Sequence, residues 1–472
     1  MTAAIGRDRD RSLVTRNGRS LILVVGAASL ITSIGLGARA TYGVYLDPVI
    51  TDLGTGRGMF SLAIAIQNIM WGLTQPLAGA IADRFGAARV LSVGAVGYAG
   101  ALVLMSSAQS ATVFTLSVGL IMGVAAGAAS FSVVLAAVGR MAPPDKTSMA
   151  LGIVTAMGSV GQFVLIPLTR QLIDNYGWRS TAVLLAAFVA TVALFSWPIR
   201  GKAIEQQGQA AVRAAAAGPA VPLSQELRRA VHHRPYVLLN AAFFVCGFHV
   251  TFIATHLVSY AGDEGVSRGA ATLGLSLIGL FNIVGSLLAG YLGSRRPKTY
   301  LLSAIYALRG LIMVAFVLVP LSGTTVVVFG ALIGLVWLST VPLTGGIVAA
   351  QFGTTHSGTL FGFVFLSHQI GAFIGVYMAG VLADRAGSYA TVWWIAIGLA
   401  ALAAVLHLLI DERPAPPAPV RSAGAGAGGF APAGAAAIIV VAGAAAALSA
   451  QPTQADAALA GSVFCVLHPA SP

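Results

Sequence analysis

The sequence predicts an all-α membrane protein with twelve membrane-spanning helices in two similar six-helix halves. Three observations predict this fold class: many apolar residues, their grouping into long runs, and few charges. Hydrophobic residues make up 57% of the 472-residue chain and charged residues only 9%, whereas soluble domains carry about 25% charged residues to face water. Runs of about 18 or more apolar residues can cross a bilayer as helices, in which backbone groups pair within their own segment.

Each apolar run is bounded by a short polar or charged segment, which defines the predicted spans in chain order. Each run is long enough to cross a hydrocarbon core of about 30 Å. The spans are residues 21–46, 59–81, 89–108, 113–139, 148–168, 178–198, 236–260, 269–292, 299–319, 324–350, 357–379 and 389–410. Residues 431–449 offer an alternative thirteenth span, although most of that stretch is Ala and Gly.

Lys and Arg are distributed unevenly among the predicted loops. If the N-terminus is cytoplasmic, the great majority of the 27 Lys and Arg fall on the cytoplasmic side, as the positive-inside rule requires. The net charge of +12 is therefore explained by membrane topology rather than by nucleic-acid binding. We expect a multi-pass protein of the cell inner (plasma) membrane with both termini in the cytoplasm.

A long polar segment between the sixth and seventh spans divides the chain. It is rich in Gln, Ala, Gly and basic residues, which is the composition of a solvated linker. The predicted organisation is a cytoplasmic N-terminal tail (1–20), an N-terminal six-helix half (21–198), a cytoplasmic linker (199–235), a C-terminal six-helix half (236–413) and a low-complexity Ala/Gly/Pro tail (414–472).

Related loop sequences recur after every third span. They contain glycine beside aspartate, arginine or both, and they are residues 79–86, 174–179, 290–296 and 380–387. Such recurrence is typical of transporters built from nested three-helix repeats.

The loop after the second span contains the pattern Gly79-x-x-x-Asp83-Arg84-x-Gly86-x-x-Arg89. With twelve spans and a long central loop, the chain resembles the major facilitator superfamily over about residues 18–413. The resemblance implies the major facilitator fold and a gating role for this motif. Its glycines permit a tight turn, and Asp83 can cap or pair at the N-terminal end of a neighbouring helix. The alternative is a topology anchor without a gating role.

Within that superfamily, the first span resembles the monocarboxylate and oxalate–formate transporter branch through Gly37-Ala-Arg39-Ala-Thr-Tyr42-Gly-Val-Tyr-Leu46. Arg39 falls where that branch has a lysine that contributes to substrate binding. In the eighth span the branch has Asp and, four residues later, Arg, where this chain has Asn282 and Ser286. The fifth span lacks the Gly-Pro-x-x-Gly-Gly motif of drug–proton antiporters. The resemblance implies a small organic anion as substrate.

Two arginines lie inside predicted spans. A charge at bilayer depth costs at least about 2.5–3.5 kcal/mol, so it usually faces a cavity or a partner. We expect Arg39 to bind a carboxylate through its fork of N–H donors, with Tyr42 on the same helix face. The alternative for Arg39 is an internal ion pair, with Asp47 the nearest carboxylate in sequence. For Arg309 the alternatives are a second anion contact or a structural contact to backbone carbonyls.

Other polar residues within the spans complete the predicted site. Gln75, Asn282 and Trp337 are expected to contact substrate, although polar residues in spans also serve as contacts between helices. His249, His256 and His368 are candidate proton carriers because histidine titrates near neutral pH. For each histidine the alternative is a neutral ring hydrogen-bonded between helices.

No Walker pattern and no zinc-ligand spacing is present in the sequence, which argues against ATP-driven transport by this chain and against a metal site. We therefore expect no enzyme and no cofactor, but a monomeric secondary active transporter. Its expected substrate is a small organic anion, specifically a monocarboxylate, moved by alternating access with protons as the candidate coupling ion. The alternatives are an exporter of amphiphilic compounds or drugs, and a transport-inactive membrane sensor.

Overall fold

The computed structural model describes residues 20–143, 145–200, 223–353 and 356–416, which contain helices and no strand. The N-terminal half comprises α2 (Leu21–Ala40), α3 (Tyr42–Leu53), α4 (Arg57–Phe85), α5 (Ala87–Ser106), α6 (Ala111–Phe114), the π-helix η1 (Thr115–Ile121), α7 (Met122–Ala128), α8 (Phe131–Met141), α9 (Thr147–Ala190), α10 (Val192–Phe195) and the 3-10 helix η2 (Trp197–Ile199). The C-terminal half comprises α13 (Arg234–Asp263), α14 (Arg268–Gly293), α15 (Lys298–Leu318), α16 (Gly323–Leu335), α17 (Thr340–Phe352), α18 (Ser357–Ala386) and α19 (Ala390–Leu408), preceded by α12 (Leu223–His232).

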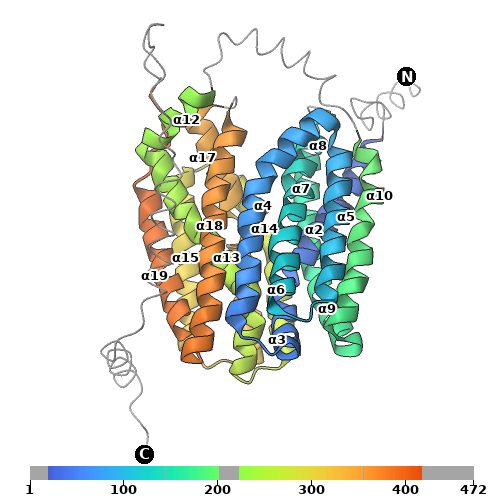
Figure 1. Cartoon of the computed structure of the whole chain (residues 1–472). Helices are drawn as coiled ribbons and strands as arrows, with labels where there is room; N and C mark the ends of the chain where they lie inside the picture. Colours follow the sequence, from blue (N-terminus) through green and yellow to red (C-terminus); the bar gives the residue numbers. More distant parts are fainter. Residues whose placement is uncertain (1–19, 144, 201–222, 354–355, 417–472) are drawn as a thin grey trace, which may run out of the picture. The chain divides into compact units, whose positions relative to one another are not determined.

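These helices form the twelve predicted spans (Figure 1). Ten helical segments among the described residues are long and apolar enough to cross a membrane. One of them, Thr147–Ile199, is two spans, because α9 turns at Gly177, where φ is 75° and ψ is 163°. The remaining span is α4, which has 29 residues and whose Gln67, Asn68 and Gln75 make it more polar than the others. The prediction of an all-α, twelve-span fold is confirmed.

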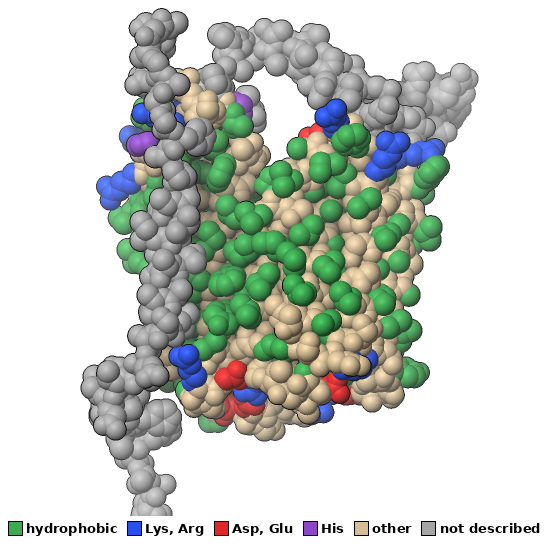
Figure 2. All heavy atoms as spheres, viewed as in Figure 1, with side chains coloured by type: hydrophobic (Ala, Val, Ile, Leu, Met, Phe, Trp, Pro, Cys, Tyr) green, Lys and Arg blue, Asp and Glu red, His purple; other side chains and the backbone are tan. Residues whose placement is uncertain are grey.

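The surface has the polarity that a membrane-embedded bundle requires. In the space-filling view, apolar side chains cover the middle of the face shown, while Lys, Arg, Asp and Glu lie at its two ends (Figure 2). Large apolar side chains such as Val93, Leu194 and Leu311 are more than 60% exposed. Such exposure would be costly in water and is expected in lipid.

Close contacts between glycines and neighbouring backbones hold the helices together. A Cβ at Gly161 of α9 would lie 2.0 Å from the carbonyl oxygen of Ser33 in α2, and one at Gly371 of α18 would lie 1.9 Å from that of Phe244 in α13. No side chain fits at such a distance. Small residues thus allow the backbones to approach, as is typical of helix packing in membranes.

Several predicted spans are interrupted rather than continuous. The first span divides at Thr41 into α2 and α3, and continues to Leu53 rather than ending at residue 46. The fourth divides between α7 and α8 and the tenth between α16 and α17, which are equivalent positions in the two halves. Interrupted helices free backbone groups near the centre of the bundle, and transporters use them to line binding sites.

Two of the predicted terminal segments fall largely outside the described residues. These are the N-terminal tail, 1–20, and the C-terminal tail, 414–472, with the alternative thirteenth span at 431–449. Of the predicted linker 199–235, residues 223–232 form α12. Its Glu226 is 3% exposed and forms an ion pair of 3.0 Å with Arg229, which also donates to the carbonyl of Ala415. One face of this part of the linker is therefore packed on the bundle, while half of the residues of α12 are exposed.

The recurring loops contain glycines that adopt a left-handed backbone. Gly86, which alone separates α4 from α5, has φ 94°, and Gly387 at the end of α18 has φ 62°. With Gly177, three of the four recurring loops place a glycine where other residues are strained. The sequence repeat thus reflects a repeated turn geometry.

The two ends of the bundle differ. At the end where α3 lies, the N-terminal and C-terminal halves are joined by polar contacts between α4, α13 and α18. At the opposite end, where α8 and α12 lie, the described surface is hollowed between the halves (Figure 2). We call these the closed end and the open end.

Candidate functional site

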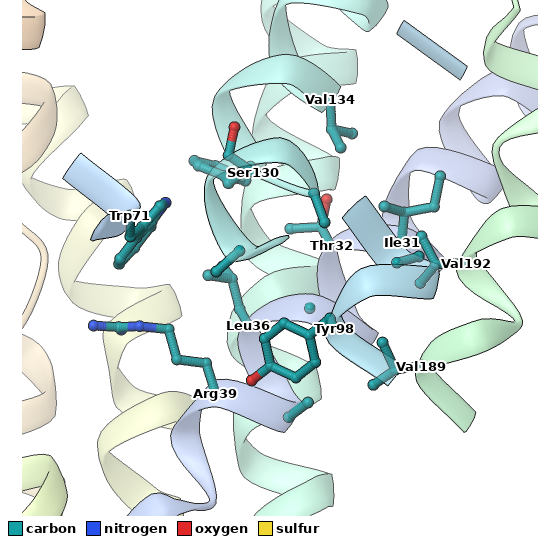
Figure 3. A pocket seen from close by; sticks show the side chains of 16 residues that line it. Ile31, Thr32, Leu36, Arg39, Trp71, Tyr98, Ser130, Val134, Val189 and Val192 are labelled. Carbon is teal, nitrogen blue, oxygen red and sulfur yellow. The ribbon is translucent and has the colours of Figure 1, made fainter. Parts of the chain in front are cut away.

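Arg39 lies in the last turn of α2, near the middle of the bundle. Its Nη2 donates to Asn68 Oδ1 at 2.8 Å, and its guanidinium carbon lies 4.4 Å from the centre of the Trp71 ring. Figure 3 shows the Arg39 side chain extending toward Trp71. Arg39 is half-buried and forms no ion pair with any acidic residue that the structure describes. The alternative of an internal ion pair with Asp47 is not observed, since Asp47 instead accepts from Ser259 Oγ at 2.7 Å.

Two cavities meet at Arg39. The first lies inside the N-terminal half, among α2, α5, α7, α8 and α10. The second lies between the halves, where residues of α2, α3 and α9 face α13 and α14. Leu36 and Arg39 line both cavities. The guanidinium is therefore placed where a solute between the halves could reach it.

Tyr42 lines the second cavity, and neighbouring groups fix its hydroxyl. The hydroxyls of Tyr42 and Tyr98 lie 2.6 Å apart, and Gln67 Nε2 donates to the Tyr42 oxygen at 2.8 Å. Gln67 also donates to the carbonyl of Val118 at 3.1 Å. The predicted pair of Arg39 and Tyr42 is thus brought together, with Tyr42 held in place by residues of α4 and α5.

A chain of hydrogen bonds runs from Arg39 across the two halves to His368. Asn68 accepts from Arg39 through its side chain and from Gln369 Nε2, at 3.0 Å, through its backbone carbonyl. Gln369 Oε1 lies 3.0 Å from His368 Nδ1. Because the Gln369 amide nitrogen already donates, its oxygen must accept, so Nδ1 of His368 carries the hydrogen. The other ring nitrogen, Nε2, is then the one that can take up a proton.

Arg309 has a different environment. It is fully buried in α15, and its guanidinium donates to the carbonyls of Val336 and, at 2.7 Å, Trp337. These carbonyls belong to the interruption between α16 and α17, which leaves them without helical partners. Arg309 lines neither cavity. Its geometry matches the structural alternative, contact with backbone carbonyls, rather than a second anion contact.

The remaining predicted binding residues are dispersed. Trp337 lines the second cavity. Asn282 is 4% exposed and donates to Ser159 Oγ at 3.0 Å, while its oxygen accepts from the backbone N–H of Leu338 and from Ser286. Neither Asn282 nor Gln75 lines the two cavities. Asn282 instead ties α14 to α9 and to the interruption of the tenth span.

Gln75 contacts α8. Its Nε2 donates to Ser132 Oγ at 2.8 Å. It therefore connects two helices of the N-terminal half, as polar residues in spans often do.

Of the three histidines, only His368 is connected to Arg39. His249 is fully buried, with Nε2 2.8 Å from the carbonyl of Ala396 in α19. His256 is fully buried near the closed end, with Ser61 Oγ at 3.1 Å from Nε2 and the Tyr389 hydroxyl at 3.0 Å from Nδ1. His256 therefore bridges α4 and α13, one from each half.

The predicted gating motif lies at the open end. Asp83 pairs with Arg140 in the last turn of α8, at 3.0 Å, rather than at the N-terminal end of a helix. Gly86 forms the turn, Arg89 Nη1 lies 3.5 Å from the carbonyl oxygen of Phe85, and Arg84 lies over the Phe85 ring. A Cβ at Gly79 would meet nothing within 4 Å, so that glycine is not required by packing here.

Several residues that surround Arg39 are not among those predicted for the site. They are Asn68, Trp71, Tyr98 and Gln369. Asn68 and Trp71 lie in the same predicted span as Gln75, so that prediction pointed to the right helix. Gln369 directly follows the predicted His368. Nothing in the sequence distinguishes Tyr98, because its role depends on helices that are distant in the chain. No group of three His, Cys, Asp or Glu that could hold a metal ion occurs among the described residues.

Comparison with known proteins agrees with this architecture. Residues 28–344, more than half of the chain, match the sequence model of the Major Facilitator Superfamily. The uncharacterized MFS-type transporter YcxA of Bacillus subtilis (strain 168) is 26% identical over 405 residues, covering 82% of this chain and 95% of that protein. Monocarboxylate transporter 13 of Rattus norvegicus is 24% identical over 371 residues, covering 78% and 83%. Monocarboxylate transporter 12 of the same species is 27% identical over 359 residues, covering 69% and 72%.

Solved structures show the same fold at low sequence identity. A D-xylose-proton symporter superposes with a TM-score of 0.65 at 13% identity, covering 84% of this chain and 98% of that one. The family match, the monocarboxylate transporters among the relatives and the twelve-helix architecture together identify this chain as a multi-pass membrane transporter, not an enzyme, that belongs to the Major Facilitator Superfamily and resembles its monocarboxylate branch.

Proposed function

We propose that this protein is a secondary active transporter that moves a small organic anion, a monocarboxylate, by alternating access. The observation that carries the proposal is Arg39, a cation at mid-bundle that faces two cavities and has no carboxylate partner in the described structure. The names of the relatives, monocarboxylate transporters 12 and 13, support the same substrate class.

The environment of Arg39 leaves it able to bind an anion. An arginine has five N–H donors, and one of them, on Nη2, donates to Asn68. Trp71 covers the guanidinium without consuming a hydrogen bond, and cation–π contact of this kind contributes about 0.5–2 kcal/mol. The remaining donors can bind a carboxylate bidentately. Tyr42, three residues on, lines the same cavity and adds a polar group beside it.

The hydrogen-bonded chain to His368 supports proton coupling. Arg39 and His368 lie at the two ends of a hydrogen-bonded chain through Asn68 and Gln369. A proton on His368 Nε2 would add a second positive charge to this chain, and like charges repel each other inside the bundle. An anion at Arg39 weakens this repulsion, so anion binding and protonation favour each other by linkage. Among the predicted proton carriers, His368 is therefore the one that we propose for coupling.

The closed end supplies the second element of an alternating-access cycle. The backbone N–H groups of Arg57 and Gly58, at the start of α4, donate to the two carboxylate oxygens of Asp384 at 2.9 and 2.7 Å. Arg57 also pairs with Asp263 at 2.6 Å. Because Asp384 and Asp263 belong to the other half, these contacts join the halves at one end while the other is open. Release of these contacts and closure of the open end would expose Arg39 to the opposite side.

The distribution of basic residues indicates which end of the bundle faces the cytoplasm. Lys and Arg are concentrated in the loops of the open end, so we propose that the open end faces the cytoplasm and that both termini lie there, in the plasma membrane. The motif of Asp83 and Arg84 then lies at the cytoplasmic surface. We propose that it acts as a gate when the two halves close there.

The test of the proposed substrate is the affinity for pyruvate of purified protein in lipid nanodiscs. We expect Arg39→Ala to weaken binding about tenfold to hundredfold, because a hydrogen bond to a charged group contributes about 1.5–3 kcal/mol. Arg39→Lys keeps the charge but loses the fork, and should bind with intermediate affinity. Calorimetry measures the dissociation constant of pyruvate for the native chain, for Arg39→Ala and for Arg39→Lys.

A matched control removes a cation elsewhere. Arg268 at the start of α14 is exposed at the closed end, and Arg268→Ala should bind pyruvate as the native chain does. Equal affinities for the native chain and Arg39→Ala would refute the carboxylate assignment.

A further inference from the structure

We propose that the cavity inside the N-terminal half, here called the pouch, receives the apolar tail of the transported acid, so that the protein prefers monocarboxylates with several tail carbons to the smallest ones. This inference rests on the proposed function and specifies its substrate class. The pouch begins at Arg39 and Leu36, which also line the cavity between the halves. An acid whose carboxylate binds Arg39 could therefore extend its tail into the pouch.

The lining of the pouch suits a hydrocarbon group. Most of its residues are apolar, including Ala95, Ala126, Phe131 and Val134, and Arg39 is its only charged residue. Figure 3 shows Val189, Val192 and Ile31 grouped on the side away from Trp71. A tail that carries a second carboxylate would lose its hydration here and find no charged partner beyond Arg39. The pouch should therefore reject dicarboxylates.

The comparison of the two halves shows that this space is not required by the fold. The pouch lies among α2, α5 and the interruption between α7 and α8. The equivalent elements of the C-terminal half are α13, α15 and the interruption between α16 and α17. There the side chain of Arg309 is fully buried against that interruption and bonds to its carbonyls. Arg309 is the twelfth residue of α15, and the twelfth residue of α5 is Tyr98, whose hydroxyl lies 2.6 Å from that of Tyr42.

The interruption in the N-terminal half also leaves a polar group without a partner. Ser130, between α7 and α8, is 3% exposed, lines the pouch, and its Oγ has no hydrogen-bond partner. A buried hydroxyl without a partner is destabilising. A polar substituent on the tail could donate to this oxygen, whereas a purely apolar tail would leave it unpaired. The geometry thus favours tails of a few carbons, with room for one hydroxyl.

The test uses 2-oxo acids that share one head group and differ in their tails: pyruvate, 2-oxohexanoate and 2-oxoglutarate. Binding to the full chain in lipid nanodiscs is measured by calorimetry. Each buried methylene should improve affinity by up to about fourfold, so 2-oxohexanoate should bind at least about tenfold tighter than pyruvate. 2-Oxoglutarate, whose tail is charged, should bind no better than pyruvate.

A substitution that fills the pouch separates the tail from the head group. Gly35 of α2 lines the pouch, and a Cβ there would meet nothing within 4 Å. We expect Gly35→Leu to remove the advantage of 2-oxohexanoate and to change pyruvate affinity less than twofold. Ala126 of α7 lines the pouch from another side. If Gly35→Leu does not fold, Ala126→Leu takes its place and should likewise remove the advantage of 2-oxohexanoate. Gly26→Leu is the matched control, because Gly26 is exposed on the same helix and a Cβ there also meets nothing within 4 Å.

The outcomes distinguish this inference from the proposed function. Pyruvate binding that depends on Arg39, with no gain for 2-oxohexanoate, would overturn the pouch and leave the proposed function intact. If Gly35→Leu lowered the affinity for pyruvate and for 2-oxohexanoate by the same factor, the assignment of the pouch to the tail would also be overturned. If none of the acids binds to the native chain, the proposed function and the pouch fail together.

Discussion

At the scale of single residues, two arginines buried in the same bundle have opposite environments. Arg309 is fully enclosed, and its guanidinium bonds to carbonyls that an interrupted helix leaves free. Arg39 is half-buried, has one hydrogen bond and a Trp71 ring beside it, and faces two cavities. Both place a charge at bilayer depth, which is costly. What differs is whether the protein itself supplies the acceptors or leaves them to a ligand.

His368 gives a prediction about pH at this scale. Because anion binding at Arg39 and protonation of His368 favour each other, pyruvate should bind more tightly at lower pH. His368→Gln should remove this pH dependence of the affinity. Calorimetric titration at several pH values measures the effect.

The control is His407→Gln. His407 is also fully buried, but its Nδ1 lies 2.8 Å from the carbonyl of Ala403 in its own helix, and its ring stacks on Tyr306. That variant should keep the native pH dependence. A His368→Gln protein that retains it as well would rule out this coupling route.

At the scale of helices, glycine positions decide how closely the spans approach. Gly371 and Gly375 of α18 face α13, where a Cβ would lie 1.9 Å from the carbonyl oxygen of Phe244 and 2.6 Å from that of Phe248. The same role recurs in the fourth span, where Gly123 and Gly127 pack against α4. The stripes of small residues therefore determine the spacing between spans.

Gly371→Leu should force α18 away from α13 and destabilise the bundle. Overpacking costs about 1–3 kcal/mol, and a backbone contact of this kind cannot relax by side-chain rotation. The melting temperature of the purified protein should therefore fall by several degrees. Gly362→Leu, on the same helix, meets nothing within 4 Å at its Cβ and should melt near the native temperature. Similar melting of the two variants would contradict this account of the packing.

At the scale of the whole molecule, the closed end depends on a carboxylate that caps a helix of the other half. The N-cap of α4 is Gly56, which has no side chain to bond the first N–H groups of the helix, and Asp384 supplies the acceptors instead. A Cβ at Gly56 would lie 2.4 Å from Asp384 Oδ2. Glycine is thus needed for this contact between the halves.

Asp384→Asn should weaken the closed end by about 1 kcal/mol, because it removes the charge that the helix N-terminus favours. The fraction of molecules open at that end should then rise about fivefold. Ala254 lines the cavity between the halves. In an Ala254→Cys variant, the rate at which a membrane-impermeant maleimide added to intact cells labels this cysteine reports the opening. The native Cys246 and Cys465 are replaced by Ser.

Two further cysteines provide the control and test the orientation. Gly269, exposed at the closed end, and Gly290, exposed at the open end, have room for a side chain. Gly269→Cys should be labelled from outside in both backgrounds, and Gly290→Cys in neither. The reverse pattern would show that the open end faces outward. An unchanged labelling rate at residue 254 would show that Asp384 does not hold the halves together.

The sequence by itself determined the number of spans, their approximate limits and the division into two halves, because the hydrophobic effect and backbone pairing in lipid act on contiguous segments. It also determined that Arg39 is an unusual residue. The interruptions of the spans, the contact of Asp384 with α4 and the chain from Arg39 to His368 were decided by the tertiary structure. Each joins residues of different helices, such as Asn68 and Gln369, and local sequence does not specify which faces of packed helices meet. The opposite environments of Arg39 and Arg309 arise in the same way, from the neighbours that packing places beside each guanidinium.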